Sequence, residues 1–179
     1  MIARAGAGPR RRLVVLRHAK SARPEGVADH ARPLAPRGCR DAPAAGRALA
    51  ENDCLPDLAL CSTAVRARRT WELAADQWGT PPPVRYDPRL YAVGVPALLG
   101  AVRETPPHVG TLLLVGHNPG LENLVLELAG DGVGHTLDDV RAKFPTSAIA
   151  VLSWHGHSWE ALAPGGTLLT AVIVPRGRK

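Results

Sequence analysis

The sequence places guanidinium and imidazole side chains in three segments that share one pattern. Arg17 and His18 are adjacent in the first segment. Arg66 stands near the start of a segment typical of a helix, and His117 lies within a Gly-His-Asn-Pro-Gly stretch. Guanidinium groups bind anionic oxygens, and an unprotonated imidazole can attack an electrophilic centre such as phosphorus. Together these side chains indicate a site for a phosphate-like anion.

Each of the three segments follows a short apolar run, at residues 13–16, 58–61 and 111–115. Such continuous runs are typical of strands that are buried on both faces of a sheet. One such segment alone is explained as well by a solvated strand end or a structural histidine. In open α/β sheets, however, the carboxyl ends of parallel strands meet at one edge, where ligands bind. Three strand ends that all deliver Arg or His therefore favour one shared anion site.

The remaining pattern predicts an α/β fold, in which helices cover both faces of a mostly parallel central sheet with an antiparallel edge. The main expected helices lie at residues 36–52, 62–78, 96–104 and 121–129. Two closing strands, at residues 148–154 and 159–163, are expected to form a hairpin through residues 156–158, before a last strand at residues 168–174. A Gly-rich loop is expected after residue 129.

Length and composition indicate one globular domain. The chain has 179 residues, of which 45% are hydrophobic and 21% charged, so disorder is excluded as the overall state. We expect a flexible basic tail at residues 1–11, one domain at residues 12–175 and a basic tail at residues 176–179. No apolar run approaches the roughly 18 residues that a membrane helix needs, so we expect no membrane partner. The short apolar run after the first arginines predicts no secretory signal, and three unpatterned cysteines fit a reducing compartment. A cytoplasmic protein is expected.

The net charge of +6 favours an acidic partner, either nucleic acid or phosphate. Aromatic residues make up only 4% of the chain, which argues against a surface that stacks on bases. Nucleic acid is therefore not the favoured partner. A basic protein that binds nucleic acid or another anion without catalysis nevertheless stays open as the non-enzyme alternative. The salt dependence of DNA retention would distinguish it from an enzyme.

Several other catalytic and metal-binding patterns fail on spacing. Cys61 and Arg66 are one residue too close for the C-x5-R loop of a cysteine phosphatase, and no P-loop sequence is present. His155 and His157 flank a predicted turn, but no second pair of ligands at zinc spacing accompanies them. The sequence therefore predicts no metal site.

Five motifs resemble those of the histidine phosphatase superfamily, and in particular its phosphohistidine phosphatase, or SixA-like, branch. The motifs are Leu16-Arg17-His18-Ala19-Lys20-Ser21; Asp29 to Leu34 followed by Gly38; Ser62-Thr63-Ala64 with Arg66, Arg69 and Thr70; Gly116-His117-Asn118-Pro119; and Lys143-Phe144-Pro145-Thr146. They follow one another in order over residues 13–175. The resemblance implies a three-layer sandwich of the phosphoglycerate-mutase-like type.

The resemblance also implies a mechanism. His18 would attack phosphorus and become a phosphohistidine, while Arg17, Arg66 and His117 would surround the phosphoryl oxygens. Water would then release phosphate. No metal and no cofactor is expected, because the cationic groups would take the place of a metal. Asp29 is the candidate for a general acid.

The substrate class is left open between two possibilities. Larger relatives supply a glutamate acid from an insertion that has no counterpart in residues 87–104. A phosphoramidate needs less acid assistance than an alkyl ester, so a phosphohistidine-bearing protein is the favoured substrate. A small phosphorylated metabolite is the alternative. The sequence does not predict an oligomeric state.

Overall fold

The central strand, β1 (Arg10–Arg17), contains the apolar run Leu13–Leu16, whose four side chains are fully buried. The computed structural model describes residues 8–178, and within them seven strands form one sheet. The other strands are β2 (Leu58–Ser62), β3 (Val84–Asp87), β4 (Thr111–Gly116), β5 (Ala129–Gly132), β6 (Ile149–His155) and β7 (Thr167–Ile173). Their order across the sheet is β3-β2-β4-β1-β6-β7-β5.

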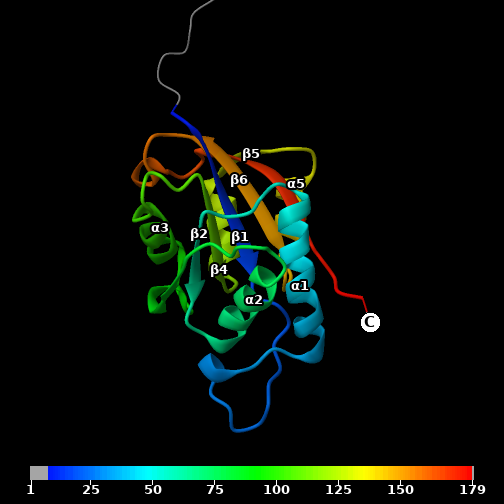
Figure 1. Cartoon of the computed structure of the whole chain (residues 1–179). Coiled ribbons are helices and arrows are strands. Elements are labelled where there is room, and N and C mark those ends of the chain that lie inside the picture. The colour runs from blue at the N-terminus through cyan, green and yellow to red at the C-terminus, as the bar shows by residue number, and fades with distance from the viewer. Residues whose placement is uncertain (1–7, 179) are drawn as a thin grey trace, which may run out of the picture.

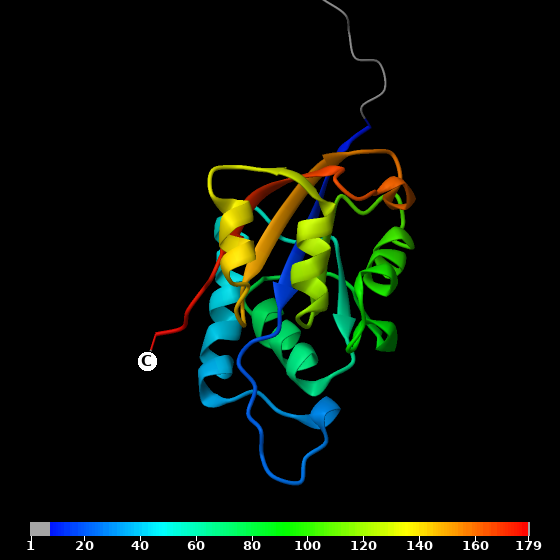
Figure 2. The ribbon, with the colours of Figure 1, turned by 180° about the vertical axis from the view of Figure 1, so that it is seen from behind.

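Helices cover both faces of the sheet, because successive side chains of a strand point to opposite faces. Leu13 and Val15 belong to one apolar cluster, and Val14 and Leu16 belong to the other. The helices are α1 (Pro36–Glu51), α2 (Val65–Ala75), α3 (Val95–Arg103), α4 (Gly120–Leu128) and α5 (Thr136–Ala142). Helices α1 and α2 lie on the face toward the viewer in Figure 1. Helices α3, α4 and α5 pack on the other face (Figure 2). The expected three-layer α/β sandwich is confirmed.

The position of the antiparallel strand in the sheet differs from the expectation. Strands β3, β2, β4 and β1 run parallel, as does β5 with β7. Strand β6 is antiparallel to both of its neighbours, β1 and β7, so the antiparallel strand lies inside the sheet and not at its edge. The sequence pattern could not predict where β6 lies in the sheet, because its partner β1 is distant along the chain.

The expected hairpin at residues 148–163 does not form. Residues Trp159–Ala161 form a short 3₁₀ helix, η3, and β6 pairs instead with β7. The Ser158 hydroxyl accepts a hydrogen bond from the Glu160 amide and starts this turn. Trp159 is fully buried, and its indole nitrogen donates to the Val109 carbonyl at 2.8 Å. The segment expected to be a strand is therefore a short helical turn that buries the Trp159 side chain.

Residues 129–142 also differ from the expected Gly-rich loop. They form β5, which pairs with β7, and the short helix α5.

No helix within residues 8–178 combines the length and apolar character that a bilayer crossing requires.

The two expected basic tails are more ordered than predicted where the structure describes them. Arg10 and Arg11 belong to β1, and residues 1–7 and 179 lie outside the described residues. At the other end, the Gly177 amide donates to a carboxylate oxygen of Asp41 at 2.9 Å. Residues 10–11 therefore belong to the first strand and not to a tail, whereas residues 176–178 form no helix or strand, although Asp41 holds them against α1.

Arg11 explains why the start of β1 is fixed. Its side chain is buried, with the residue 3% exposed, and it lies against the ring of Trp159. The guanidinium donates hydrogen bonds of 2.7–2.8 Å to the carbonyl oxygens of Pro107, Val109, Gly156 and His157. One side chain thus joins β1 to two loops at the amino end of the strand.

We expect Arg11→Met to lower the free energy of unfolding by about 2–4 kcal/mol, because it removes four hydrogen bonds to buried and partly buried carbonyls and the contact of the guanidinium with Trp159. Chemical denaturation measures this change. Arg10→Met is the matched control: Arg10 is exposed, and its removal should change stability by less than about 0.5 kcal/mol. Equal losses in the two variants would contradict the role assigned to Arg11.

Candidate active site

A polar pocket lies at the carboxyl ends of the adjacent strands β2, β4 and β1, which is the lower end of the sheet in Figure 1. Its volume is about 220 Å³. Four residues expected to share a site line it: Arg17, His18, Arg66 and His117. The other lining residues are Lys20, Ser21, Arg23, Arg32, Asn118 and Thr146. The pocket therefore has basic and neutral polar walls, which suit an anion.

His18 follows the last residue of β1 and is buried, with 7% of the residue exposed. Its Nδ1 lies 2.8 Å from the carbonyl oxygen of Ala19. A carbonyl can only accept, so Nδ1 carries the hydrogen and Nε2 keeps the lone pair. The pKa of His18 is lowered to about 3, mainly by burial, with contributions from the nearby His117 and Arg66. The imidazole is therefore neutral near pH 7.

His117 follows β4, and its ring centroid lies 5.1 Å from that of His18. Its Nε2 is 2.7 Å from the hydroxyl of Ser62, the last residue of the neighbouring strand β2. Burial lowers the pKa of His117 to about 4, and the charge of Arg66 acts in the same direction. Its Nδ1 is buried without a hydrogen-bond partner among the described residues.

The segment before β6 closes one side of the pocket. The Phe144 carbonyl accepts hydrogen bonds from Arg17 Nη1 and from Asn118 Nδ2, each at 2.9 Å. The Ser147 amide donates to the carbonyl of Arg17 at 3.1 Å. These contacts leave Arg17 Nε buried and without a partner in residues 8–178. Arg17 lines the pocket, so its guanidinium lies close to where an oxyanion would bind.

Arg66, in the first turn of α2, is held by Asp29. Its Nη1 donates to the Asp29 carbonyl at 2.6 Å, and its Nη2 lies 3.1 Å from a carboxylate oxygen of Asp29. The Tyr91 hydroxyl donates to the same carboxylate at 2.6 Å, and Arg32 pairs with it at 2.8 Å. The bonds from Tyr91 and Arg32 hold the pKa of Asp29 well below its usual range.

Asp29 is the one expected site residue that does not line the pocket. Its side chain is 53% exposed, and its carboxylate is ionised at neutral pH. The position fits a residue that orients Arg66, and Asp29 remains a candidate acid only if a bound substrate raises its pKa.

Supporting residues were not identified individually from the sequence. The Thr70 hydroxyl accepts from the Ala19 amide at 2.9 Å and donates to the Arg66 carbonyl at 2.7 Å, so it joins α2 to the turn after β1. Ser62 and Thr70 both lie in the motif that contains Arg66, where Ser62 resembles an ordinary helix cap and Thr70 an ordinary helical residue. Arg32 lies in the motif that contains Asp29. Tyr91, which also packs against the ring of His117, carries no local signal in the sequence.

The described residues contain no group of three or more His, Cys, Asp or Glu side chains arranged to hold a metal ion.

Comparisons with known proteins agree with this geometry. The family model of the histidine phosphatase superfamily (branch 1) matches residues 13–163. An uncharacterized protein of Mycobacterium tuberculosis is 45% identical over 163 residues, which cover 90% of this chain and 100% of the relative.

Two solved structures are similar over almost their whole length. A protein of Nakamurella multipartitia, assigned as the phosphohistidine phosphatase SixA, has a TM-score of 0.82 and 35% identity, over 95% of this chain and 99% of that chain. The protein histidine phosphatase SixA complexed with tungstate has a TM-score of 0.73 and 25% identity, over 92% and 97%. This chain belongs to the histidine phosphatase superfamily, in its SixA-like branch, and is a histidine-type phosphatase.

Proposed function

We propose that this phosphatase removes phosphoryl groups from phosphohistidine on proteins, through a second phosphohistidine formed on its own His18. One observation carries the proposal: the neutral imidazole of His18 lies in a pocket lined by Arg17 and Arg66. A nucleophilic histidine must keep a lone pair, and a phosphoryl group needs cationic partners. Both requirements are met at the same place.

The proposed reaction has two displacements at phosphorus. Nε2 of His18 forms a bond to phosphorus as the bond to the substrate nitrogen breaks, and the leaving imidazole takes up a proton from solvent. Water then attacks phosphorus, His18 leaves, and inorganic phosphate is released. Arg17 and Arg66 stabilise the charge on the phosphoryl oxygens in both steps. The presence of both residues in the lining of the same pocket as His18 supports this assignment.

The choice of a phosphorus–nitrogen substrate rests on the absence of a positioned acid. None of the described residues that line the pocket is a carboxylic acid. Asp87, the last residue of β3, and Glu104 both pair with Arg89, at 2.8 and 2.7 Å. An alkoxide leaves poorly without an acid, whose help is worth roughly 10²–10⁴ in rate. Imidazole is a weaker base and leaves more readily.

A small phosphorylated metabolite is the second candidate substrate, and an adjoining cavity favours it. This cavity has a volume of about 320 Å³ and shares His117 and Asn118 with the phosphate pocket. Leu90, Val93 and Leu98 give it an apolar lining. It could hold an apolar part of a small phosphate ester beside the catalytic histidines.

A phosphate-release assay distinguishes the candidates. The parent protein is given a protein phosphorylated on histidine, a small phosphoramidate and a panel of sugar and nucleotide phosphates. We expect the largest kcat/KM for the phosphohistidine protein. Faster hydrolysis of one metabolite than of any phosphohistidine substrate would favour the second candidate.

The nucleophile is tested by His18→Ala, which should lower kcat by at least about 10³-fold while circular dichroism stays unchanged. An acid-labile phosphoenzyme should be trapped in the parent and not in the variant. His108→Ala, which changes an exposed histidine, is the control and should keep parent activity. A phosphoenzyme of normal yield in the His18 variant would refute the assignment.

The lowered histidine pKa values predict a pH-dependent stability. Unfolded histidines titrate near pH 6.5, whereas His18 and His117 titrate at about 3 and about 4 in the fold. Between about pH 6.5 and 4 the unfolded chain therefore binds more protons than the folded chain. The free energy of unfolding should fall as the pH falls through this window.

Denaturation at a series of pH values measures this dependence. We expect the loss to be smaller in His18→Gln than in the parent, because one buried neutral imidazole is removed. His108→Gln should follow the parent. The same slope in all three proteins would show that the buried imidazole does not carry the effect.

The role of Asp29 is tested by Asp29→Asn with two substrates, an alkyl phosphate and a small phosphoramidate. If Asp29 positions Arg66, the variant should lose a similar factor on both, about tenfold or more, because the ion pair at 3.1 Å is weakened. Loss on the alkyl phosphate alone would instead identify Asp29 as the general acid.

A further inference from the structure

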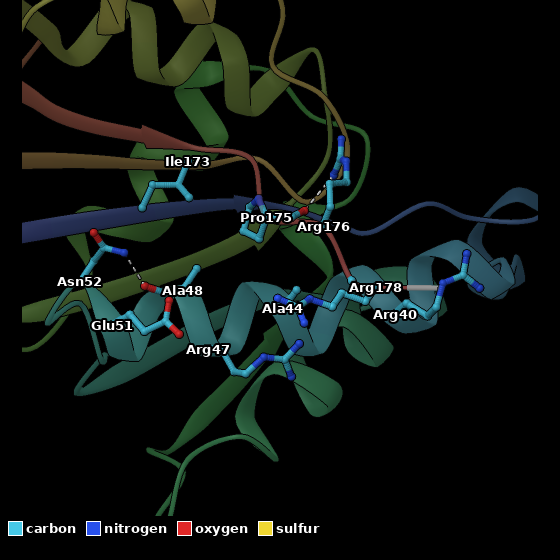
Figure 3. A pocket seen from close by; sticks show the side chains of 11 residues that line it. Arg40, Ala44, Arg47, Ala48, Glu51, Asn52, Ile173, Pro175, Arg176 and Arg178 are labelled. Carbon is cyan, nitrogen blue, oxygen red and sulfur yellow. Dashed lines mark hydrogen bonds between the residues drawn. The ribbon is translucent and has the colours of Figure 1, made fainter.

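A basic groove lies between α1 and the C-terminal segment 173–178, apart from the phosphate pocket (Figure 3). Its volume is about 740 Å³. Arg40 and Arg47 line it from α1, and Arg176 and Arg178 line it from the C-terminal segment. The same walls include apolar residues: Ala44, Ala48, Ile173 and Pro175. Nothing in the proposed reaction uses these residues.

A buried carboxylate holds the two walls of this groove together. Asp41 of α1 is 1% exposed, and its Oδ1 accepts a hydrogen bond from the Gly177 amide at 2.9 Å. Its Oδ2 pairs with Arg37 at 3.2 Å and with Arg176 at 3.5 Å. A Cβ at Gly177 would collide with the Arg40 carbonyl, so the segment lies directly against the helix. The groove is thus formed before any partner binds, which lowers the entropic cost of binding.

The charge of the groove is strongly unbalanced. Four arginines line it, and Glu51 is the one acid among its described lining residues. Arg40, Arg47 and Arg178 are exposed, so their guanidinium groups are accessible to a partner. Like charges gathered on one surface attract an oppositely charged molecule and speed its association.

The groove is structurally connected to the phosphate pocket. Arg176 Nη1 donates to the carbonyl of Thr146 at 3.0 Å, and Thr146 lines that pocket. On the α1 side, Gly38 lies against the backbone of Lys20, which also lines the pocket. A macromolecule bound in the groove would therefore contact Arg176, which is bonded directly to a residue of the phosphate pocket.

We propose that this groove binds an acidic, amphipathic segment of the phosphoprotein substrate. Carboxylates of the segment would contact the arginines, and an apolar side chain would pack on Ala48 and Ile173. The identification of the bound protein as the substrate rests on the proposed function. A protein segment fits better than nucleic acid for two reasons. The described lining contains no aromatic ring for base stacking, and its apolar residues Ala44, Ala48, Ile173 and Pro175 suit an apolar side chain better than a sugar–phosphate backbone.

The first test measures binding without any phosphoryl group. The probe is a fluorescent, unphosphorylated peptide rich in Glu and Leu, titrated with the whole protein. Arg40→Glu/Arg178→Glu should raise the Kd at least about tenfold, and parent binding should weaken as salt increases. The control, Arg85→Glu/Arg141→Glu, makes the same change of charge on β3 and α5 and should leave the Kd unchanged.

The second test measures catalysis by the same three proteins. On a phosphohistidine protein, kcat/KM of the groove variant should fall about tenfold because KM rises. On a small phosphoramidate, the same variant should keep parent activity. Because the peptide carries no phosphoryl group, its binding result stands whether or not phosphohistidine is hydrolysed.

Two outcomes would overturn the proposal. One is equal peptide binding by the parent, groove variant and control. The other is salt-dependent retention of DNA that only the groove variant loses, with unchanged hydrolysis of the phosphohistidine protein; this would assign the groove to nucleic acid.

Discussion

A histidine that attacks phosphorus has to keep its lone pair while it is surrounded by the cations that attract its substrate. In this protein, burial of the ring of His18, the proposed nucleophile, lowers its pKa, and the neighbouring guanidiniums act in the same direction. The Ala19 carbonyl then fixes which nitrogen is free. The site depends on the order of β2, β4 and β1 in the sheet. Because these strands are neighbours, their carboxyl ends bring Arg66, His117 and Arg17 close to the buried ring of His18.

Two carboxylates, Asp29 and Asp41, hold arginine side chains in position. Asp29 binds Arg66 through its backbone carbonyl and its side chain, and Tyr91 and Arg32 share its carboxylate. Asp41 has a similar place in the groove, where it joins α1 to residues 176–177. In both cases an acid fixes the position of arginines without lying in the cavity that they line. The linings of the two cavities therefore stay mainly basic.

Much of the site could be predicted from the sequence, because its signals are local. The buried runs at 13–16, 58–61 and 111–115 are short and clean, and a charged or imidazole side chain follows each one. The rule that parallel strand ends meet at one edge then brings Arg17, Arg66 and His117 together.

Other features depend on contacts that no local pattern encodes. Strand β5 forms from a Gly-rich stretch because β7 provides its partner, and η3 replaces a strand because Trp159 is buried beside Val109. The partnership of Tyr91 with Asp29 spans 62 positions of the chain. Only the folded arrangement reveals it.

Strand β1 is held by chemically different groups at its two ends. At its amino end, Arg11 binds four backbone carbonyls, and neither a guanidinium nor a carbonyl changes charge as a solution is acidified. At its carboxyl end, the fold depends on imidazoles that must remain neutral. Acid should therefore loosen the molecule from one end: amide hydrogens around the strand ends of β1, β2 and β4 would exchange first, while those near Arg11 stay protected. The pocket that holds His18 and His117 thus lies at the end of the sheet where we expect acid to act first.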